Sequence, residues 1–179
     1  MAKLLLRDPR LDPAPPFESS SSLFSSYETL ISIAASKGLN EIVELLLVHP
    51  RMAGKSDGFN AALWYATSSG NCEILKLLLK DGRANPTEGQ TFSMACSQVN
   101  DQVVRLYLED GRLDPSMNNQ EALIHACWYE KLNIAKILVE DPRVDLETAL
   151  NRLESIPQQS FNNKRKVIDL LKTFKKKGA

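Results

Sequence analysis

The sequence predicts an all-α fold, a solenoid of stacked helix–turn–helix units. The first observation is that four segments of 23 residues align without a gap, at 29–51, 61–83, 90–112 and 121–143. Their starts lie 32, 29 and 31 residues apart, so the length variation falls in the connections. The second is that each copy contains two short apolar patterns with helical spacing. A unit of this size cannot bury its own apolar face, whereas stacked copies can.

The first helix of each copy carries a pair of small residues. The first members are Ala34, Ala66, Ala95 and Ala126, followed by Ala35, Thr67, Cys96 and Cys127 respectively. Small side chains at these places let a neighbouring backbone approach closely, so we expect them at contacts between repeats.

The second helix carries five apolar positions, which in the first full copy are Ile42, Val43, Leu45, Leu46 and Leu47. Such a face is too wide for an isolated helix and suits burial between neighbours. Gly38 and Gly70 separate the two helices at a turn. Val99 and Glu130 replace this glycine in the later copies, so a positive φ at either residue would be mildly strained. Helix ends are expected at Gly82 and Gly111, and before Pro9, Pro50 and Pro142.

The repeated pattern resembles the ankyrin repeat. The consensus of the first helix and turn is small/apolar-apolar-Leu-x-x-Ala-small-x-x-Gly, and that of the second helix is Ile-Val-x-Leu-Leu-Leu. Thr29 and Ile31 match the Thr and Leu of the Thr-Pro-Leu-His signature of the ankyrin repeat. Leu30 takes the proline slot, and Ser32 and Trp64 take the histidine slot. The Asp-Pro-Arg-x-Asp-Pro turn at 8–13 resembles a divergent subclass seen in protist and large-virus proteins. The resemblance implies an ankyrin-repeat solenoid.

The domain boundaries follow from the alignment. We expect one repeat array over residues 1–172, interrupted by a Pro- and Ser-rich finger at 14–28 and followed by a basic tail at 173–179. The array comprises a partial copy at 1–13, full copies at about 29–60, 61–89, 90–120 and 121–147, and a degenerate copy at 148–172.

Composition is that of an ordinary globular protein, with 43% hydrophobic and 25% charged residues and a formal net charge of zero. The charge is nevertheless uneven, since residues 1–163 carry 15 Lys/Arg and 21 Asp/Glu, a net of −6, and residues 164–179 carry a net of +6. Three widely spaced cysteines argue against a disulfide framework. No apolar run has the length of a membrane span, so we expect a cytoplasmic protein, with the nucleus as the alternative. We expect a monomer that does not bind membranes.

Nothing in the sequence indicates catalysis or a metal or cofactor site. His125 and Cys127 are two residues apart on a helix, so they point to different faces and cannot chelate one ion. Cys96 and Cys127 are expected as small core residues, too far apart for a disulfide. His49 is expected to end a helix in a structural role. No zinc motif or phosphate-binding glycine loop is present, and we expect a protein without enzymatic activity.

An arginine ends every clear copy, and four of the five have an aspartate two residues earlier. The arginines are Arg10, Arg51, Arg83, Arg112 and Arg143, and the aspartates are Asp8, Asp81, Asp110 and Asp141. A basic stripe could bind phosphate-rich ligands, but the paired acids neutralise it. We therefore expect structural pairing at the turns.

The resemblance also implies a binding surface, because partners of ankyrin arrays usually contact the turn tips and the two residues after the small pair. The latter are Ser36, Lys37, Ser68, Ser69, Ser97, Gln98, Trp128 and Tyr129, and the tip positions include Asp57, Gly58, Asn60, Thr87, Met117, Asn118 and Gln120. Most of these are small or polar. Trp128 and Tyr129 are the exception, and large aromatic residues are enriched at binding hot spots. The alternative is that one ring packs on the degenerate last copy.

The leading hypothesis is therefore a scaffold or adaptor that binds a protein partner through its concave face and turn tips. A second is that the array is the targeting part of a longer catalytic or effector chain. A third, less favoured, is nucleic-acid contact through the basic C-terminal tail. Ankyrin surfaces are chemically generic, so the partner's identity does not follow from the fold.

Overall fold

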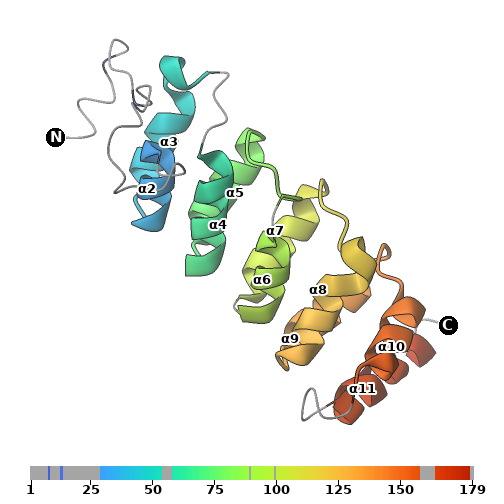
Figure 1. Ribbon diagram of the computed structural model, residues 1–179. Helices are drawn as coiled ribbons and strands as arrows, with labels where there is room; N and C mark the ends of the chain where they lie inside the picture. The colour runs from blue at the N-terminus through green and yellow to red at the C-terminus, as the bar shows by residue number, and fades with distance from the viewer. Residues whose placement is uncertain are drawn as a thin grey trace. The chain divides into compact units, whose positions relative to one another are not determined.

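The computed structural model describes residues 8, 13, 29–53, 58–88, 90–98, 100–157 and 164–177. All regular secondary structure in these residues is helical, which confirms the all-α class (Figure 1). The chain divides into two compact units, Met1–Glu88 and Gly89–Ala179. The partial copy, apart from Asp8 and Pro13, and the finger at 14–28 lie outside the described residues.

The described residues of the first unit form two helix pairs and a short 3₁₀ turn. The elements are α2 (Leu30–Ser36), α3 (Asn40–Val48), η1 (Pro50–Met52), α4 (Phe59–Ser69) and α5 (Cys72–Asp81). The first helices of the pairs, α2 and α4, pack on each other, as do the second helices, α3 and α5. We call the first helix of each pair the inner helix and the second the outer helix.

The second unit repeats this arrangement with three pairs. Its elements are α6 (Thr91–Gln98), α7 (Asp101–Asp110), α8 (Met117–Trp128), α9 (Leu132–Glu140), α10 (Leu146–Ser155) and α11 (Lys164–Lys177). The inner helix α8 packs on both α6 and α10, and the outer helices α7 and α9 pack on each other. The last helix, α11, contacts α8, α9 and α10.

The small residues of the inner helices lie in the core, as the repeat pattern predicts. Ala35, Ala66, Ala95 and Ala126 have no solvent-exposed surface. On the outer helix α3, Val43 and Leu46 are buried, whereas Ile42, Leu45 and Leu47 are half-buried. The inner and outer helices thus both contribute apolar side chains to the core.

The turns follow the predicted chemistry. Gly38 and Gly70 have φ values of 67° and 69° between the paired helices, and Glu130 adopts the same left-handed region with a φ of 58°. A non-glycine residue there is strained, as expected for Glu130. Gly82 and Gly111 are left-handed C-caps of α5 and α7, which confirms their predicted role.

Gly58 is held at the start of α4 by a close approach to the preceding pair. Its φ is 77°, and a Cβ atom built on it would lie 1.7 Å from the Oγ1 atom of Thr29. Thr29 itself caps α2, since its Oγ1 atom accepts from the Ser32 amide while the Ser32 hydroxyl oxygen accepts from the Thr29 amide. A side chain at Gly58 would clash with Thr29, so this tip position requires glycine for structural reasons.

Two helix boundaries differ from the expected ones. Helix α8 begins at Met117, before the expected start near 121, because turn hydrogen bonds such as Gln120 N to Ser116 O continue into the helix. Its first turn is irregular, with positive φ at Asn118 and Gln120. Helix α11 continues to Lys177, so residues 173–177 of the expected basic tail are helical. No helix in the described part of the chain is long and apolar enough to cross a membrane.

Candidate functional site

The serines predicted to contact a partner use their hydroxyl groups within their own helices. Ser36 donates to the Ile33 carbonyl, and Ser97 donates to the Met94 carbonyl, each across 2.9 Å. Ser68 and Ser69 both donate to the Tyr65 carbonyl on α4. These positions present short polar side chains whose donors are already occupied. Lys37 is exposed at the C-terminus of α2, while Asp57 and the side chain of Gln98 lie outside the described residues.

Trp128 and Tyr129 are two adjacent, exposed aromatic side chains at the C-terminal end of α8. Trp128 ends α8 and is 40% exposed, and Tyr129 caps the same helix and is 56% exposed. Helices α10 and α11 pack against α8, and both rings keep solvent-exposed surface. The two rings therefore form an aromatic pair that solvent reaches.

A line of polar contacts runs along α8 to this aromatic pair. The Nδ2 atom of Asn118 donates to Glu121 Oε2 across 2.9 Å, and Glu121 Oε1 lies 3.8 Å from the Nε2 atom of His125. The His125 ring then meets the Tyr129 ring edge to face, with 6.3 Å between centroids. Glu121, His125 and Tyr129 follow one another at four-residue spacing, and Asn118 lies three residues before Glu121, so they share one helix face. Glu121 and His125 were not among the predicted site residues, although their spacing to Tyr129 could have indicated them.

An open hollow with a volume of about 320 Å³ lies at the turn between α8 and α9. Glu130, one of its lining residues, follows Tyr129 in the sequence. Its lining consists of Asp101, Glu130, Lys131, Leu132, Asn133 and Ile134. The turn between α8 and α9 and the start of α7 thus supply two carboxylates and one ammonium group to the same hollow.

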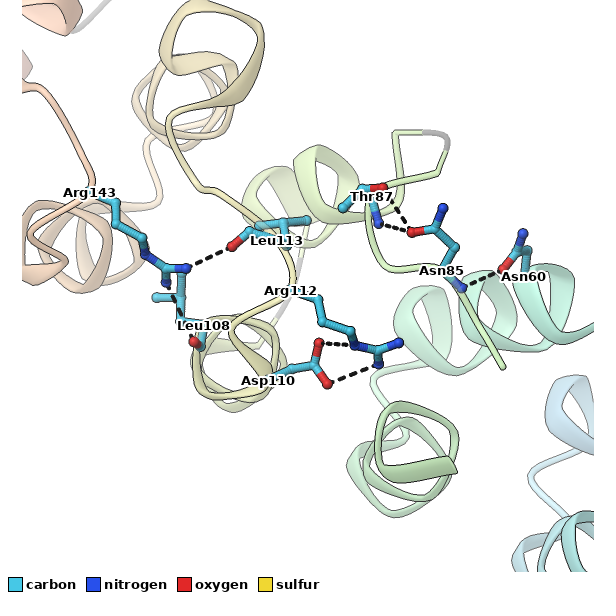
Figure 2. Close-up of polar contacts among 8 residues, drawn as sticks. All are labelled: Asn60, Asn85, Thr87, Leu108, Asp110, Arg112, Leu113 and Arg143. Carbon is cyan, nitrogen blue, oxygen red and sulfur yellow. Dashed lines mark hydrogen bonds and ion pairs between the residues drawn. The ribbon is translucent and has the colours of Figure 1, made fainter. Parts of the chain in front are cut away.

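The tip residue Asn60 is used within the first unit. Its Oδ1 atom accepts from the Asn85 amide across 2.7 Å, and its Nδ2 atom donates to a carboxylate oxygen of Glu88. Asn85 in turn accepts from both the amide and the hydroxyl of Thr87 (Figure 2). These bonds tie α4 to the turn after α5, so the Asn60 side chain has a structural role. In the second unit the tip residue Met117 is exposed.

Three of the arginines that end the copies, Arg83, Arg112 and Arg143, are paired with the aspartate two residues earlier, as predicted. Arg83 binds Asp81 with two hydrogen bonds of 2.6 and 2.7 Å, and Arg143 binds Asp141 at 2.9 and 2.7 Å. Arg112 is paired with Asp110 in the same way (Figure 2). The hydrogen bonds from arginine lower the pKa of Asp81 and of Asp141 below the ordinary value.

Arg83 and Arg143 also bind carbonyl groups of the preceding pair, which the sequence analysis missed. Arg83 donates from Nη1 to the Met52 carbonyl at 2.6 Å and from Nη2 to the Leu47 carbonyl at 2.9 Å. In the second unit Arg143 reaches the Leu113 carbonyl at 2.8 Å and, more weakly, the Leu108 carbonyl at 3.5 Å (Figure 2). Arg83 and Arg143 thus link neighbouring pairs within their own units.

His49 replaces the aspartate in the copy that ends at Arg51. The imidazole is buried, and its Nδ1 atom accepts from the Arg51 amide across 3.3 Å, as Asp141 accepts from the Arg143 amide. Its Nε2 atom lies 3.3 Å from the Asp8 carbonyl oxygen. A neutral ring with its proton on Nε2 satisfies both contacts. The geometry supports the predicted structural role of His49.

The first unit has exposed apolar side chains that the sequence analysis did not single out. Leu30 and Ile33 are exposed on α2, and Trp64 is 46% exposed on α4, where its ring meets Tyr65 edge to face. Trp64 was noted only as the occupant of the histidine slot. Its exposure is similar to that of Trp128, so it is a second candidate for contact with a partner.

The cysteines are free thiols without a ligand set around them. Burial covers Cys96 and Cys127 completely and raises the pKa of both thiols, that of Cys127 to about 12. Cys72 is half-buried at the start of α5, and its pKa is also raised by burial. Within the described residues, no group of three or more His, Cys, Asp or Glu side chains could hold a metal ion.

Comparison with known proteins identifies one family. The family model for ankyrin repeats (3 copies) matches residues 1–88. No curated protein and no solved structure matches the chain.

Proposed function

Because residues 1–88 are ankyrin repeats, we propose that this chain is a protein-binding scaffold or adaptor without enzymatic activity of its own. Ankyrin repeats generally mediate contacts between proteins, and the family is typically non-enzymatic. The ungapped alignment at 90–112 and 121–143 supports extending the array beyond residue 88. Trp128 and Tyr129 then occupy the positions that ankyrin arrays use most often for their partners.

The observation that carries the proposal is the exposure of these two adjacent rings at the end of α8. Packing a partner against them removes a large apolar area from water and uses side chains with few rotatable bonds. The serines at the corresponding positions of the other copies are small, and their hydroxyl groups donate to carbonyls of their own helices. They therefore let a partner backbone come close without offering it a hydrogen-bond donor. Binding energy is thus concentrated in the aromatic pair.

The test starts with capture of partners from lysate of the source cells, using the full chain as bait. A captured protein is then purified, and its Kd is measured by calorimetry for the wild type and for Trp128→Ala. We expect truncation to weaken binding by about 30-fold, since loss of a hot-spot anchor costs about 2 kcal/mol or more.

Trp64→Ala is the matched control, because it removes the same ring from another exposed site. Equal affinity of wild type and Trp128→Ala, with loss of binding in Trp64→Ala, would move the anchor to the first unit. Tyr129→Ser is a second variant in case Trp128→Ala unfolds, and thermal melts of all variants report on folding.

A further inference from the structure

We infer that His49 makes the turn after α3 sensitive to mild acid, whereas the corresponding turns at Asp81 and Asp141 are insensitive to it. The inference is independent of the proposed function. It is carried by the hydrogen bonds of the buried imidazole, by the carboxylates that occupy the same position in other copies, and by the contacts that depend on the turn.

The position of His49 is one where the chain uses a hydrogen-bond acceptor. The His49 Nδ1 atom accepts from the Arg51 amide across 3.3 Å, which caps the turn η1. Asp81 and Asp141 each accept from the amide two residues later in the same way, across 3.4 and 3.0 Å. Their arginines lower the pKa of both carboxyl groups below the ordinary 3.8, so both remain acceptors in mild acid. Of these three acceptors, the imidazole is the one that mild acid removes.

Only a neutral ring fits the hydrogen bonds of His49. The Arg51 amide is a fixed donor, so Nδ1 carries a lone pair and the proton lies on Nε2, 3.3 Å from the Asp8 carbonyl oxygen. An imidazolium ion carries a proton on both nitrogens, so its Nδ1–H would face the Arg51 N–H. The side chain is 4% exposed, which leaves water little access to replace the lost hydrogen bond. Protonation therefore removes the cap of η1.

The charged groups around His49 do not offset the charge of a protonated ring. Helices α2 and α4 carry no charged residue, and the described charged residues of the first unit are Asp8, Lys37, Glu41, Glu44, Arg51, Glu73, Lys76, Lys80, Asp81, Arg83 and Glu88. Both Asp81 oxygens bind Arg83, and among these described residues no carboxylate forms an ion pair with His49. Arg83 also binds the carbonyls of Leu47 and Met52, on either side of His49 in the sequence.

The turn η1 positions two contacts of the first unit. The Met52 side chain is buried in the core, and the Met52 carbonyl accepts from Arg83 Nη1 across 2.6 Å. Loss of the His49 cap destabilises the turn that holds both groups in place. We therefore expect acid to weaken the connection between the helix pairs α2–α3 and α4–α5. The corresponding turn at Arg143 keeps its aspartate acceptor.

Urea unfolding of the full chain at pH 7.5 and at pH 5.5 tests the inference. The chain has two histidines, and the ordinary charge change of histidine falls between these pH values. The folded contacts favour the neutral ring, whereas the unfolded chain takes up a proton near about pH 6.5, so stability should fall on acidification. We expect the unfolding equilibrium constant of the wild type to rise about three- to tenfold, tenfold being the limit for one proton.

Two histidine variants locate the effect. His49→Asn removes the titrating ring and keeps an acceptor, because the asparagine side-chain oxygen can take the place of Nδ1. The rise on acidification should therefore be lost in His49→Asn. The matched control is His125→Gln, which removes the half-buried histidine of α8 and should keep the rise. An equal rise in wild type and His49→Asn, or its loss in His125→Gln, would overturn the inference.

Nuclear magnetic resonance of the wild type covers the case in which His49→Asn does not fold. Proton–nitrogen spectra of the ring should show the Nε2–H tautomer of His49 at pH 7.5. As the pH is lowered until the ring is protonated, the amide signals of Arg51 and Met52 should shift with it, while that of Arg143 should not. A proton on Nδ1 at pH 7.5, or η1 amides that stay unchanged while the ring is protonated, would contradict the inference.

Discussion

The Nη1 atom of Arg83 donates to the carbonyl oxygen of Met52 across 2.6 Å, which joins the end of one helix pair to the end of the pair before it. The second unit repeats this contact between Arg143 and Leu113. In both cases the aspartate two residues earlier fixes the guanidinium plane with two hydrogen bonds. The motif therefore holds neighbouring repeats together.

Replacing Arg83 should destabilise the protein more than loss of a surface ion pair would. Arg83→Ala removes bonds to two carbonyl groups and to Asp81, and hydrogen bonds to charged groups contribute about 1.5–3 kcal/mol each. We expect a loss of about 2–3 kcal/mol in the free energy of unfolding by urea denaturation. Arg83→Lys should lose most of the same stability, because an ammonium group lacks the planar fork. Lys76→Ala, on the exposed side of α5, is the control, and an Arg83→Lys variant as stable as wild type would contradict this role.

The stability contributed by these pairs should depend on acid. Since arginine lowers the folded-state pKa of Asp141 below the ordinary 3.8, its contribution is present above that value and is lost as pH falls through the folded pKa. Urea unfolding between pH 6 and pH 2 measures this. Asp141→Asn should flatten the dependence relative to wild type, while remaining less stable at neutral pH. Parallel curves for the two proteins would refute the coupling.

Thiol reactivity should separate the cysteines. Burial keeps reagent from Cys96 and Cys127 and raises their pKa, so little thiolate forms at neutral pH. In a timed reaction with a disulfide reagent, we expect only half-buried Cys72 to react in the folded protein, and all three to react in urea. Cys72→Ser identifies the fast site. A native Cys72→Ser protein that still reacts quickly would contradict the burial of the other two.

Enlarging the small residues of the inner helices should destabilise the fold. Ala66 and Ala95 are fully buried, so Leu at either position overpacks the core by about 1–3 kcal/mol or more. Ser69→Leu, on an exposed position of α4, should be nearly neutral in the same thermal or urea unfolding. Similar small effects at all three positions would show that the repeat register is wrong.

The repeat register predicted much of this structure because the small and apolar residues recur at fixed places. It placed Ala66 and Ala95 in the core and Gly82 at a helix end, all from local pattern. The long-range hydrogen bonds of Arg83 were not predicted. The Asp-x-Arg spacing indicates only the local ion pair, whereas the carbonyl acceptors lie on the preceding repeat. The early start of α8 was not predicted either, because it depends on turn hydrogen bonds such as Gln120 N to Ser116 O, which the apolar pattern does not show.

Fluorescence of Trp128, measured in Trp64→Phe so that it is the only tryptophan, tests the aromatic anchor most directly. At 40% exposure the free protein should show red-shifted emission and ready quenching by acrylamide. Addition of the captured partner should shift the emission to the blue and protect the ring, because a hot-spot anchor is desolvated on binding. A ring already protected in the free protein, or one whose emission and quenching do not change with saturating partner, would contradict a binding role for Trp128.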